Sequence, residues 1–228
     1  MRNIILSCAI LSCAVAGCWG QVATRPPSIT AVGTGSVSVT PDLARVDVGV
    51  FTQAATAQEA SQANATLAST VINALQSLLG SSASIKTVNY SLSPVYNNPP
   101  AGQNATIIGY SVNNTVEVTL KDLTKIGQTV DTAIQSGANR VQGISFDLQD
   151  RNAPTAQALK AAAAEAVSQA AAIAAGLNVH TGSVLHASEG VNTSVPVVGV
   201  AAPTSSTPVQ TGLVVIQASV TLEVAITP

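Results

Sequence analysis

The stretch IIGYSVNNTVEVTLKDLTKIGQTVDTAIQSGANRVQGISFDL, residues 107–148, decides the fold, because it predicts a strand, a capped helix and a second strand in succession. Between positions 110 and 120 the even residues are mostly apolar, which is the period of a strand with one buried face. Asp122 is placed to cap the following helix and Gly137 to end it. The period of two returns at Ile144, Phe146 and Leu148. The buried stripe expected on the helix is Leu123, Ile126, Val130 and Ala133.

The same plan occurs earlier in the chain, over residues 46–92. After a first strand, Thr56 and Glu59 have the spacing of a capping box at the start of a helix. Gly80 ends that helix, and a returning strand follows. The expected buried stripe is Ala60, Ala63, Leu67, Val71, Ala74 and Leu78. Two such units indicate an internal duplication. The alternative is that the two units resemble each other only because each has a helix packed on a sheet.

A first strand and a third helix lie outside these two units. The first strand, over residues 29–39, carries Gly33 and Gly35 on its apolar face, which predicts close approach of another backbone or a bulge. The third helix follows Asn152, ends at Gly176 and consists largely of alanine. Its expected buried positions are Leu159, Ala163, Ala166, Ala170 and Ile173. It is either an Ala-rich surface helix or a helix buried on both sides within an oligomer.

These elements define an α+β fold with two strand-helix-strand repeats, a third Ala-rich helix and C-terminal strands, the helices packed on an antiparallel or mixed sheet. A short strand is expected over residues 179–188 and a long amphipathic one over 214–226. The expected organisation is an export signal over 1–20, a tether over 21–28 and a single domain over 29–228. Residues 190–212 lack periodicity and are expected to form a long irregular loop.

The export signal has two competing ends. Arg2 precedes an apolar run over residues 4–15, which is too short to span a membrane. Ala14-Val15-Ala16 fits a small-residue cleavage site, whereas the residues ending at Cys18 fit a bacterial lipobox. In the second case Cys18 is lipidated and attaches the protein to a membrane. All three cysteines lie within this leader, so we expect no disulfide in the mature chain.

The composition is poor in charge. Only 9% of the 228 residues are charged, against roughly 25% in ordinary soluble domains, and the formal net charge is -2. This balance excludes a basic stripe, so nucleic acid is not expected as a partner. A polar but weakly charged surface has little self-repulsion, which favours a homo-oligomer.

No set of side chains indicates a reactive site. His180 and His186 would share a strand face, but no carboxylate or thiol cluster accompanies them, and metal sites need three or four ligands. The sequence GTGS at positions 33–36 lacks the lysine and the helix of a phosphate loop. Asp147 and Asp150 are better explained as solvated or capping groups than as a catalytic pair. We therefore expect no catalytic residues, no cofactor and no metal ligands.

Several segments of the mature chain together resemble the SIMPL domain family, whose bacterial members include periplasmic immunogenic proteins and an oxidative-stress defence protein. The segments that carry the resemblance are GTGSVSVTPD (33–42), ARV (44–46), YSLSP (90–94) with Tyr96, IGY (108–110) with Asn113 and Asn114, Asp131, and GANRVQGISF (137–146). The resemblance implies an exported or envelope-associated α+β protein, some relatives of which form large closed oligomers, without established catalytic residues. One departure is the third helix, which is charge-rich in relatives but carries only Lys160 and Glu165 here.

Two functions follow from these observations. The first is a non-enzymatic envelope protein that acts as an oligomeric scaffold or binding module, with a link to envelope or oxidative stress implied by the resemblance. The alternative is a stress-linked hydrolase or metal-dependent enzyme whose site is not recognisable in the sequence. Bound metal in the purified protein would favour the second.

Overall fold

The computed structural model describes residues 26–100, 102–194 and 211–228. The strands are β1 (Ser28–Val39), β2 (Leu43–Ala54), β3 (Ala83–Tyr96), β4 (Ile107–Leu120), β5 (Arg140–Asp147), β6 (His180–Ser194) and β7 (Val214–Thr227). The helices are α1 (Ala57–Leu79), α2 (Ile126–Gln135) and α3 (Asn152–Gly176). Among these residues the α+β prediction is therefore confirmed. The export signal, most of the tether and the greater part of the expected loop lie outside the described residues.

One sheet contains both predicted repeats. Its strand order is β3-β4-β2-β5, with every neighbouring pair antiparallel. The unit β2-α1-β3 encloses β4, and the unit β4-α2-β5 encloses β2, which is the split β-α-β arrangement of ferredoxin-like folds. Both helices pack on one face, over a cluster that includes Val46, Val71 and Val116. We call this sheet with α1 and α2 the repeat lobe.

The second sheet has the order β1-β7-β6 and is covered on one face by α3. We call it the terminal lobe, because it holds the first and last described strands. Its core consists of two small clusters between α3, β1 and β7, and Leu148 closes one of them from the connection after β5. The final strand β7 is internal, so it offers no free edge; β1 and β6 form the edges instead.

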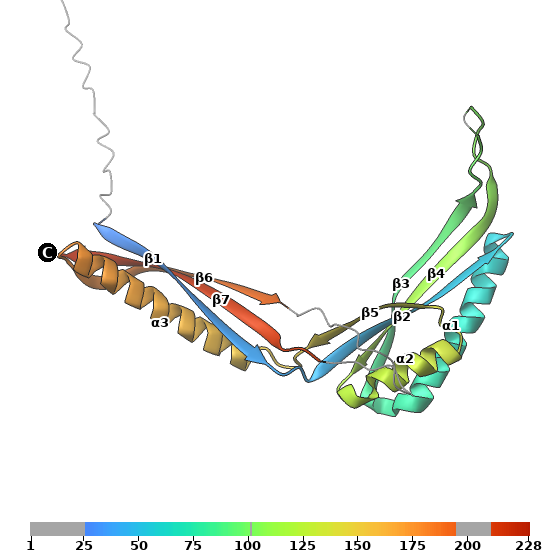
Figure 1. The fold of residues 1–228 in the computed structure, drawn as a ribbon, viewed down its shortest axis with the longest axis horizontal. Helices are drawn as coiled ribbons and strands as arrows, with labels where there is room; N and C mark the ends of the chain where they lie inside the picture. The colour runs from blue at the N-terminus through green and yellow to red at the C-terminus, as the bar shows by residue number, and fades with distance from the viewer. Residues whose placement is uncertain (1–25, 101, 195–210) are drawn as a thin grey trace, which may run out of the picture.

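The two lobes lie at opposite ends of a bent molecule (Figure 1). The helices cover the outer side of the bend, and the helix-free faces of both sheets turn toward its inner side. The β3-β4 hairpin projects from the repeat lobe, while the start of β1 and the end of β7 lie at the far end of the terminal lobe.

The helix starts in the repeat lobe follow the sequence predictions. Thr56 Oγ1 accepts from the Glu59 backbone N–H at 3.2 Å, and Glu59 accepts from the Thr56 N–H at 3.2 Å, so the capping box is present. Asp122 accepts from the Thr124 N–H at 3.1 Å, at a short 3-10 turn before α2. Gly137 ends α2 at a φ of 114°, which a side chain would strain.

The buried face of α1 differs from the prediction by about one position. Its buried residues are Ala60, Asn64, Ala68, Val71, Leu75 and Leu79. Leu67 and Leu78 are only partly buried against the core, and Ala63 faces solvent. Asn64 takes the expected place of Ala63 because its Nδ2 donates to the Val50 carbonyl at 2.8 Å, a partner the sequence alone does not reveal.

Helix α3 packs directly on the backbone of β1. Its buried residues are Ala158, Ala162, Ala166, Ala170 and Ala174, spaced by four. A Cβ atom on Gly33 would lie 2.1 Å from the Ala162 carbonyl oxygen, so the predicted close backbone approach is confirmed. Three expected positions on α3 were wrong: Leu159 is half-buried, and Ala163 and Ile173 are exposed. Because alanine occurs on nearly all sides of α3, its sequence does not indicate which side is buried. The buried side is the one whose backbone contacts Gly33 and Gly35 of β1.

Strand β6 is longer than expected. It continues to Ser194, whereas the sequence predicts a strand that ends at position 188. Residues 190–194, expected as part of an irregular loop, instead pair with residues 215–219 of β7 in regular antiparallel register. Their polar and small side chains carry no strand periodicity because both faces of β6 are largely exposed.

Candidate functional site

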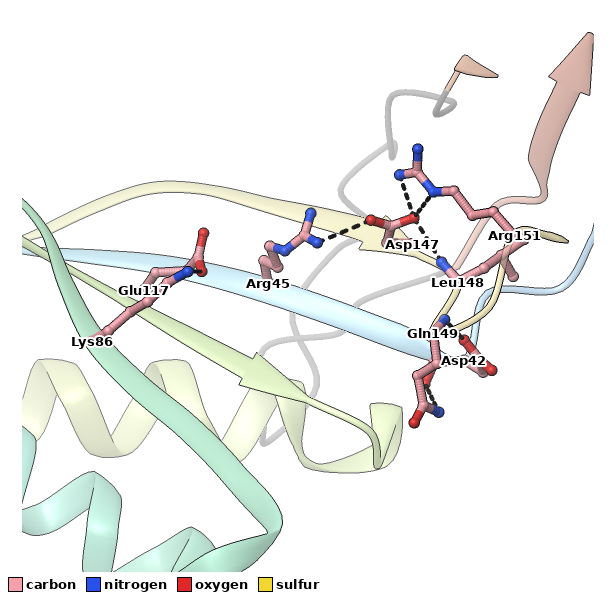
Figure 2. A network of polar contacts seen from close by, with 8 residues as sticks. All are labelled: Asp42, Arg45, Lys86, Glu117, Asp147, Leu148, Gln149 and Arg151. Carbon is pink, nitrogen blue, oxygen red and sulfur yellow. Dashed lines mark hydrogen bonds and ion pairs between the residues drawn. The ribbon is translucent and has the colours of Figure 1, made fainter. Parts of the chain in front are cut away.

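A group of charged side chains that includes three ion pairs lies on the helix-free face of the repeat lobe, where the chain crosses to the terminal lobe (Figure 2). Asp147, at the end of β5, is the centre of this group and is 4% exposed. Arg45 Nη2 on β2 lies 3.1 Å from its Oδ2, and Arg151 reaches its Oδ1 with Nε at 2.9 Å and Nη2 at 2.5 Å. Two arginines therefore share one carboxylate.

The chain on either side of Asp147 is held by further contacts. The Leu148 N–H donates to Asp147 Oδ1 at 2.7 Å. The Gln149 N–H donates to Asp42 Oδ1 at 2.7 Å, and the Asp42 N–H donates to the Asp147 carbonyl at 3.2 Å. Asp42 lies between β1 and β2, and Gln149 between β5 and α3, so these bonds join both connections between the lobes.

The protonation of Asp147 follows from this setting. Burial raises the pKa of its carboxyl group, but the hydrogen bonds from Arg151 and Leu148, together with the charges of Arg151 and Arg45, outweigh burial. The net result is a pKa below the ordinary value of 3.8, so Asp147 is ionised at neutral pH. The network is a set of ion pairs that holds backbone together, without a free nucleophile or base.

Asp47 is the carboxylate that this network leaves out. It lies directly opposite Glu117 across β2 and β4. Glu117 pairs with Lys86 at 3.0 Å, and Arg45 is engaged by Asp147. Among the described residues Asp47 Oδ1 is buried and accepts no hydrogen bond. Burial and then the charge of Glu117 raise the pKa of Asp47, and Arg45 and Lys86 oppose this only in part.

The described part of the terminal lobe has one hollow on its strands and another at the end of α3. One of about 610 Å³ is on its three strands and is lined by uncharged groups, among them Thr34, Asn192 and Gln217. The other, of about 390 Å³, lies at the C-terminal end of α3. Its lining residues are Ala171, Ala174, Ala175, Asn178, Val179, His180 and Thr181. Neither hollow brings together charged groups that could act on a substrate.

Apolar side chains are exposed on both lobes. On the β3-β4 hairpin, residues 88–96 and 107–112, which we call the arm, expose Tyr90, Leu92, Tyr96, Ile107 and Ile108. On the terminal lobe the exposed ones include Val167, Ile173 and Leu177 of α3 and its C-terminus, and Val184, Leu185 and Val191 of β6. Apolar groups gathered in this way are typical of surfaces that bind another macromolecule.

The residues considered from the sequence do not assemble into a reactive site. His180 and His186 are both exposed on β6, with two register irregularities between them. Asp147 is a buried ion-pair partner rather than a solvated group, whereas Asp150 accepts from the Asn152 N–H at 2.8 Å at the start of α3. Over the described ranges no group of three or more His, Cys, Asp or Glu could hold a metal ion. Cys18 lies outside the described residues.

The Asp147 network was not predicted from the sequence. Its members fall into two groups, residues 42–45 and 147–151, which are about a hundred residues apart, and no local motif joins Arg45 to Asp147. The low number of charged residues in the sequence was a weak indication of this pairing, because few other partners were available to Arg45 or Asp147.

Among the helices that the structure describes, none has the length and apolar character needed to cross a bilayer.

The fold and this network define an α+β protein of two lobes. Its ion pairs link β2 to β5 and to the start of α3, and hydrogen bonds of Asp42 link the two connections between the lobes. The chain belongs to the SIMPL family, described as "Protein of unknown function (DUF541)", whose family model matches residues 29–224 and so covers both lobes.

Proteins similar to this chain occur in bacteria. The chain is 29% identical to the 26 kDa periplasmic immunogenic protein of Brucella melitensis over 172 residues, which is 74% of this chain and 69% of that protein. It is 29% identical to the uncharacterized protein YggE of Escherichia coli K12 over 69% of this chain and 63% of that protein. The solved structure of AtUAH in complex with glyoxylate has a TM-score of 0.29 and 14% identity over 57% of this chain and 34% of that one. A likeness this slight carries no argument.

Proposed function

We propose that this chain is an exported protein of the cell envelope that acts as a self-associating scaffold or binding module and not as an enzyme. Its family membership and the periplasmic description of its Brucella relative support export, as does the apolar leader over residues 4–15. A role in envelope or oxidative stress, implied by the resemblance to family members, is part of this proposal. Deleting the gene should then raise the sensitivity of the cell to peroxide.

The observation that carries the proposal is the exposure of large apolar side chains at both ends of a chain with few charges. Tyr96 on the arm is 55% exposed and Leu177 after α3 is 61% exposed. The surface between them offers little charge repulsion, since the whole chain has nine basic and eleven acidic side chains. Contact between copies would remove this apolar area from water without leaving charges unpaired.

Self-association is tested on the protein without residues 1–20, by light scattering and sedimentation at micromolar concentration. We expect an assembly of several copies. Replacing Ala164 and Ala171, both exposed on α3, by glutamate should weaken it while the copy stays folded. Ala65→Glu, at an exposed position of α1, is the matched control and should change nothing. A wild-type chain that stays monomeric over the whole concentration range would overturn the proposal.

Attachment to a membrane through lipidated Cys18 is proposed as the way the protein is held in the envelope. Mass spectrometry of the mature N-terminus provides the test. A diacylated or triacylated Cys18 as first residue is the expected result, and Cys18→Ala should release the protein into the soluble fraction. A free mature terminus at Gly17 or Gln21 contradicts the anchor but leaves export intact.

A further inference from the structure

The arm has one continuous apolar face. Tyr90 pairs with Asn114, Leu92 with Val112, Pro94 with Tyr110 and Tyr96 with Ile107. Residues that pair across antiparallel strands lie on the same face of the sheet, so these side chains form one strip. Asn114 in turn pairs with Val50, which belongs to the core beneath the helices. The strip is therefore the outward continuation of the buried face of the repeat lobe.

Val112, in the inner part of the strip, is fully buried. Further out, no helix among the described residues extends over the strip, so Leu92, Tyr96 and Ile107 are exposed. Helix α1 begins at Ala57 and meets the strip only at its inner end, where Tyr90 Oη donates to Ser61 Oγ at 3.3 Å. Beyond that contact the hairpin continues past the helices (Figure 1). Tyr90 is 53% exposed, although it lies in line with the core.

The arm also carries no charge. Residues 87–116 contain no Asp, Glu, Lys, Arg or His, and all three tyrosines of the chain fall among them. Covering this strip therefore desolvates no ionised group, which removes the largest cost of burying a surface. Tyrosine is among the residues that contribute most at protein interfaces, because it buries a large ring and keeps a polar tip.

A second surface without Asp, Glu, Lys or Arg side chains lies at the other end of the molecule. The hollow of about 390 Å³ at the end of α3 is lined by alanines and by residues 178–181, and Ile173 and Leu177 are exposed on the same end of the helix. His180 is the one titratable side chain in that lining. The two charges of α3, Lys160 and Glu165, do not line the hollow, and Glu165 in the middle of the helix accepts from the Thr34 N–H at 2.6 Å.

We infer that the arm of one copy docks on the C-terminal end of α3 of a second copy, with an aromatic side chain of the strip in the hollow. This rests on the proposed self-association and names its two surfaces. The arm strip is largely apolar and carries no charge, and the hollow combines alanines with the uncharged polar groups of Asn178 and Thr181, which could accept the hydroxyl of a tyrosine. A hollow of this volume is within the range that accepts a ring-sized group. Since the surfaces lie at opposite ends of the molecule, the contact is head-to-tail. Repetition of such a contact closes into a ring or continues as a filament.

A head-to-tail contact is tested by complementation between two defective variants of the leader-free chain. The arm variant is Leu92→Glu with Tyr96→Glu, and the α3 variant is Ala175→Glu, which changes an exposed residue of the hollow. Each should be monomeric alone. Mixed in equal amounts, they should form a dimer of one copy each, because one intact arm and one intact hollow remain. Glutamate in both variants prevents a new attraction between the altered surfaces.

Ser93→Glu is the matched control, because Ser93 is exposed on the opposite face of the same strand and should leave the assembly unchanged. Urea unfolding of every variant checks that the copies fold. A second measurement uses the absence of cysteine after residue 18: Tyr96→Cys combined with Ala175→Cys should give disulfide-linked oligomers, and Ser93→Cys with Ala175→Cys should not.

The outcomes separate this inference from the proposed function. A monomeric wild-type chain overturns both. A wild-type assembly that persists in the arm variant, or two variants that do not combine into a dimer, overturns the docking of arm on α3 and leaves self-association standing.

Discussion

The guanidinium group of Arg45 pairs with the carboxylate of Asp147 at 3.1 Å and leaves Asp47, two residues further along the same strand, without a cation of its own. The two carboxylates therefore differ in protonation behaviour. Asp147 has a lowered pKa and Asp47 a raised one, although both lie on the helix-free side of the repeat lobe. Their substitutions should have opposite effects on stability.

Asp147→Asn should destabilise the protein by about 1–2 kcal/mol at neutral pH. This is the lower part of the range for charged hydrogen bonds, because both arginines remain 41% and 44% exposed and screened by water. The lowered pKa of Asp147 means that its contribution is present above the ordinary value of 3.8 and is lost as pH falls through the folded-state value. Urea unfolding at a series of pH values is the measurement. A difference between the two proteins that persists unchanged into strong acid would contradict the ion-pair explanation.

Asp47→Asn should stabilise the protein by roughly 0.5–1 kcal/mol near neutral pH, because it removes a carboxylate that faces another across the sheet. The raised pKa of Asp47 means that the folded state binds a proton more tightly than the unfolded state. Its ionisation therefore lowers stability as pH rises from 3.8 through the folded-state value. The gain from the substitution should be greatest above that range and disappear in acid, as measured by urea unfolding across pH.

Glu117→Gln provides the control for Asp47→Asn. If repulsion between the two carboxylates is a main cause, Asp47→Asn should stabilise the Glu117→Gln background less than it stabilises the wild type. Additive effects would show that burial alone raises the pKa of Asp47, without help from Glu117.

Local patterns in the sequence were enough to predict most elements of the repeat lobe. Strand periodicity in β2 and β4 and the Thr56–Glu59 capping box are set by residues close together in the chain. The phase of α1 was not predictable, because Asn64 is polar and is buried only through its bond to the Val50 carbonyl. A polar residue in a core position has no periodic signature, and its partner is found only in the folded chain.

In the terminal lobe, local sequence patterns predict even less of the packing. Alanine on nearly every side of α3 leaves no stripe to read, so the face that meets β1 could not be chosen from α3 itself. Gly33 and Gly35 predicted close backbone approach, but the element that approaches them comes more than a hundred residues later. Similarly, whether β7 was an edge strand depended on its pairing with both β1 and β6.

Gly33→Ala should be among the most destabilising small substitutions in the terminal lobe, at roughly 3 kcal/mol. The new Cβ would lie 2.1 Å from the Ala162 carbonyl oxygen and 2.3 Å from the Ala166 nitrogen, so α3 must move away from β1. Gly143→Ala on β5 is the matched control: nothing lies within 4 Å of its Cβ position, and it should be neutral or slightly stabilising in urea unfolding. Because the atoms in the way belong to the backbone of α3, Ala162→Gly should not restore Gly33→Ala. Recovery of stability in that double variant would show that side chains, and not the two backbones, set the distance between helix and strand.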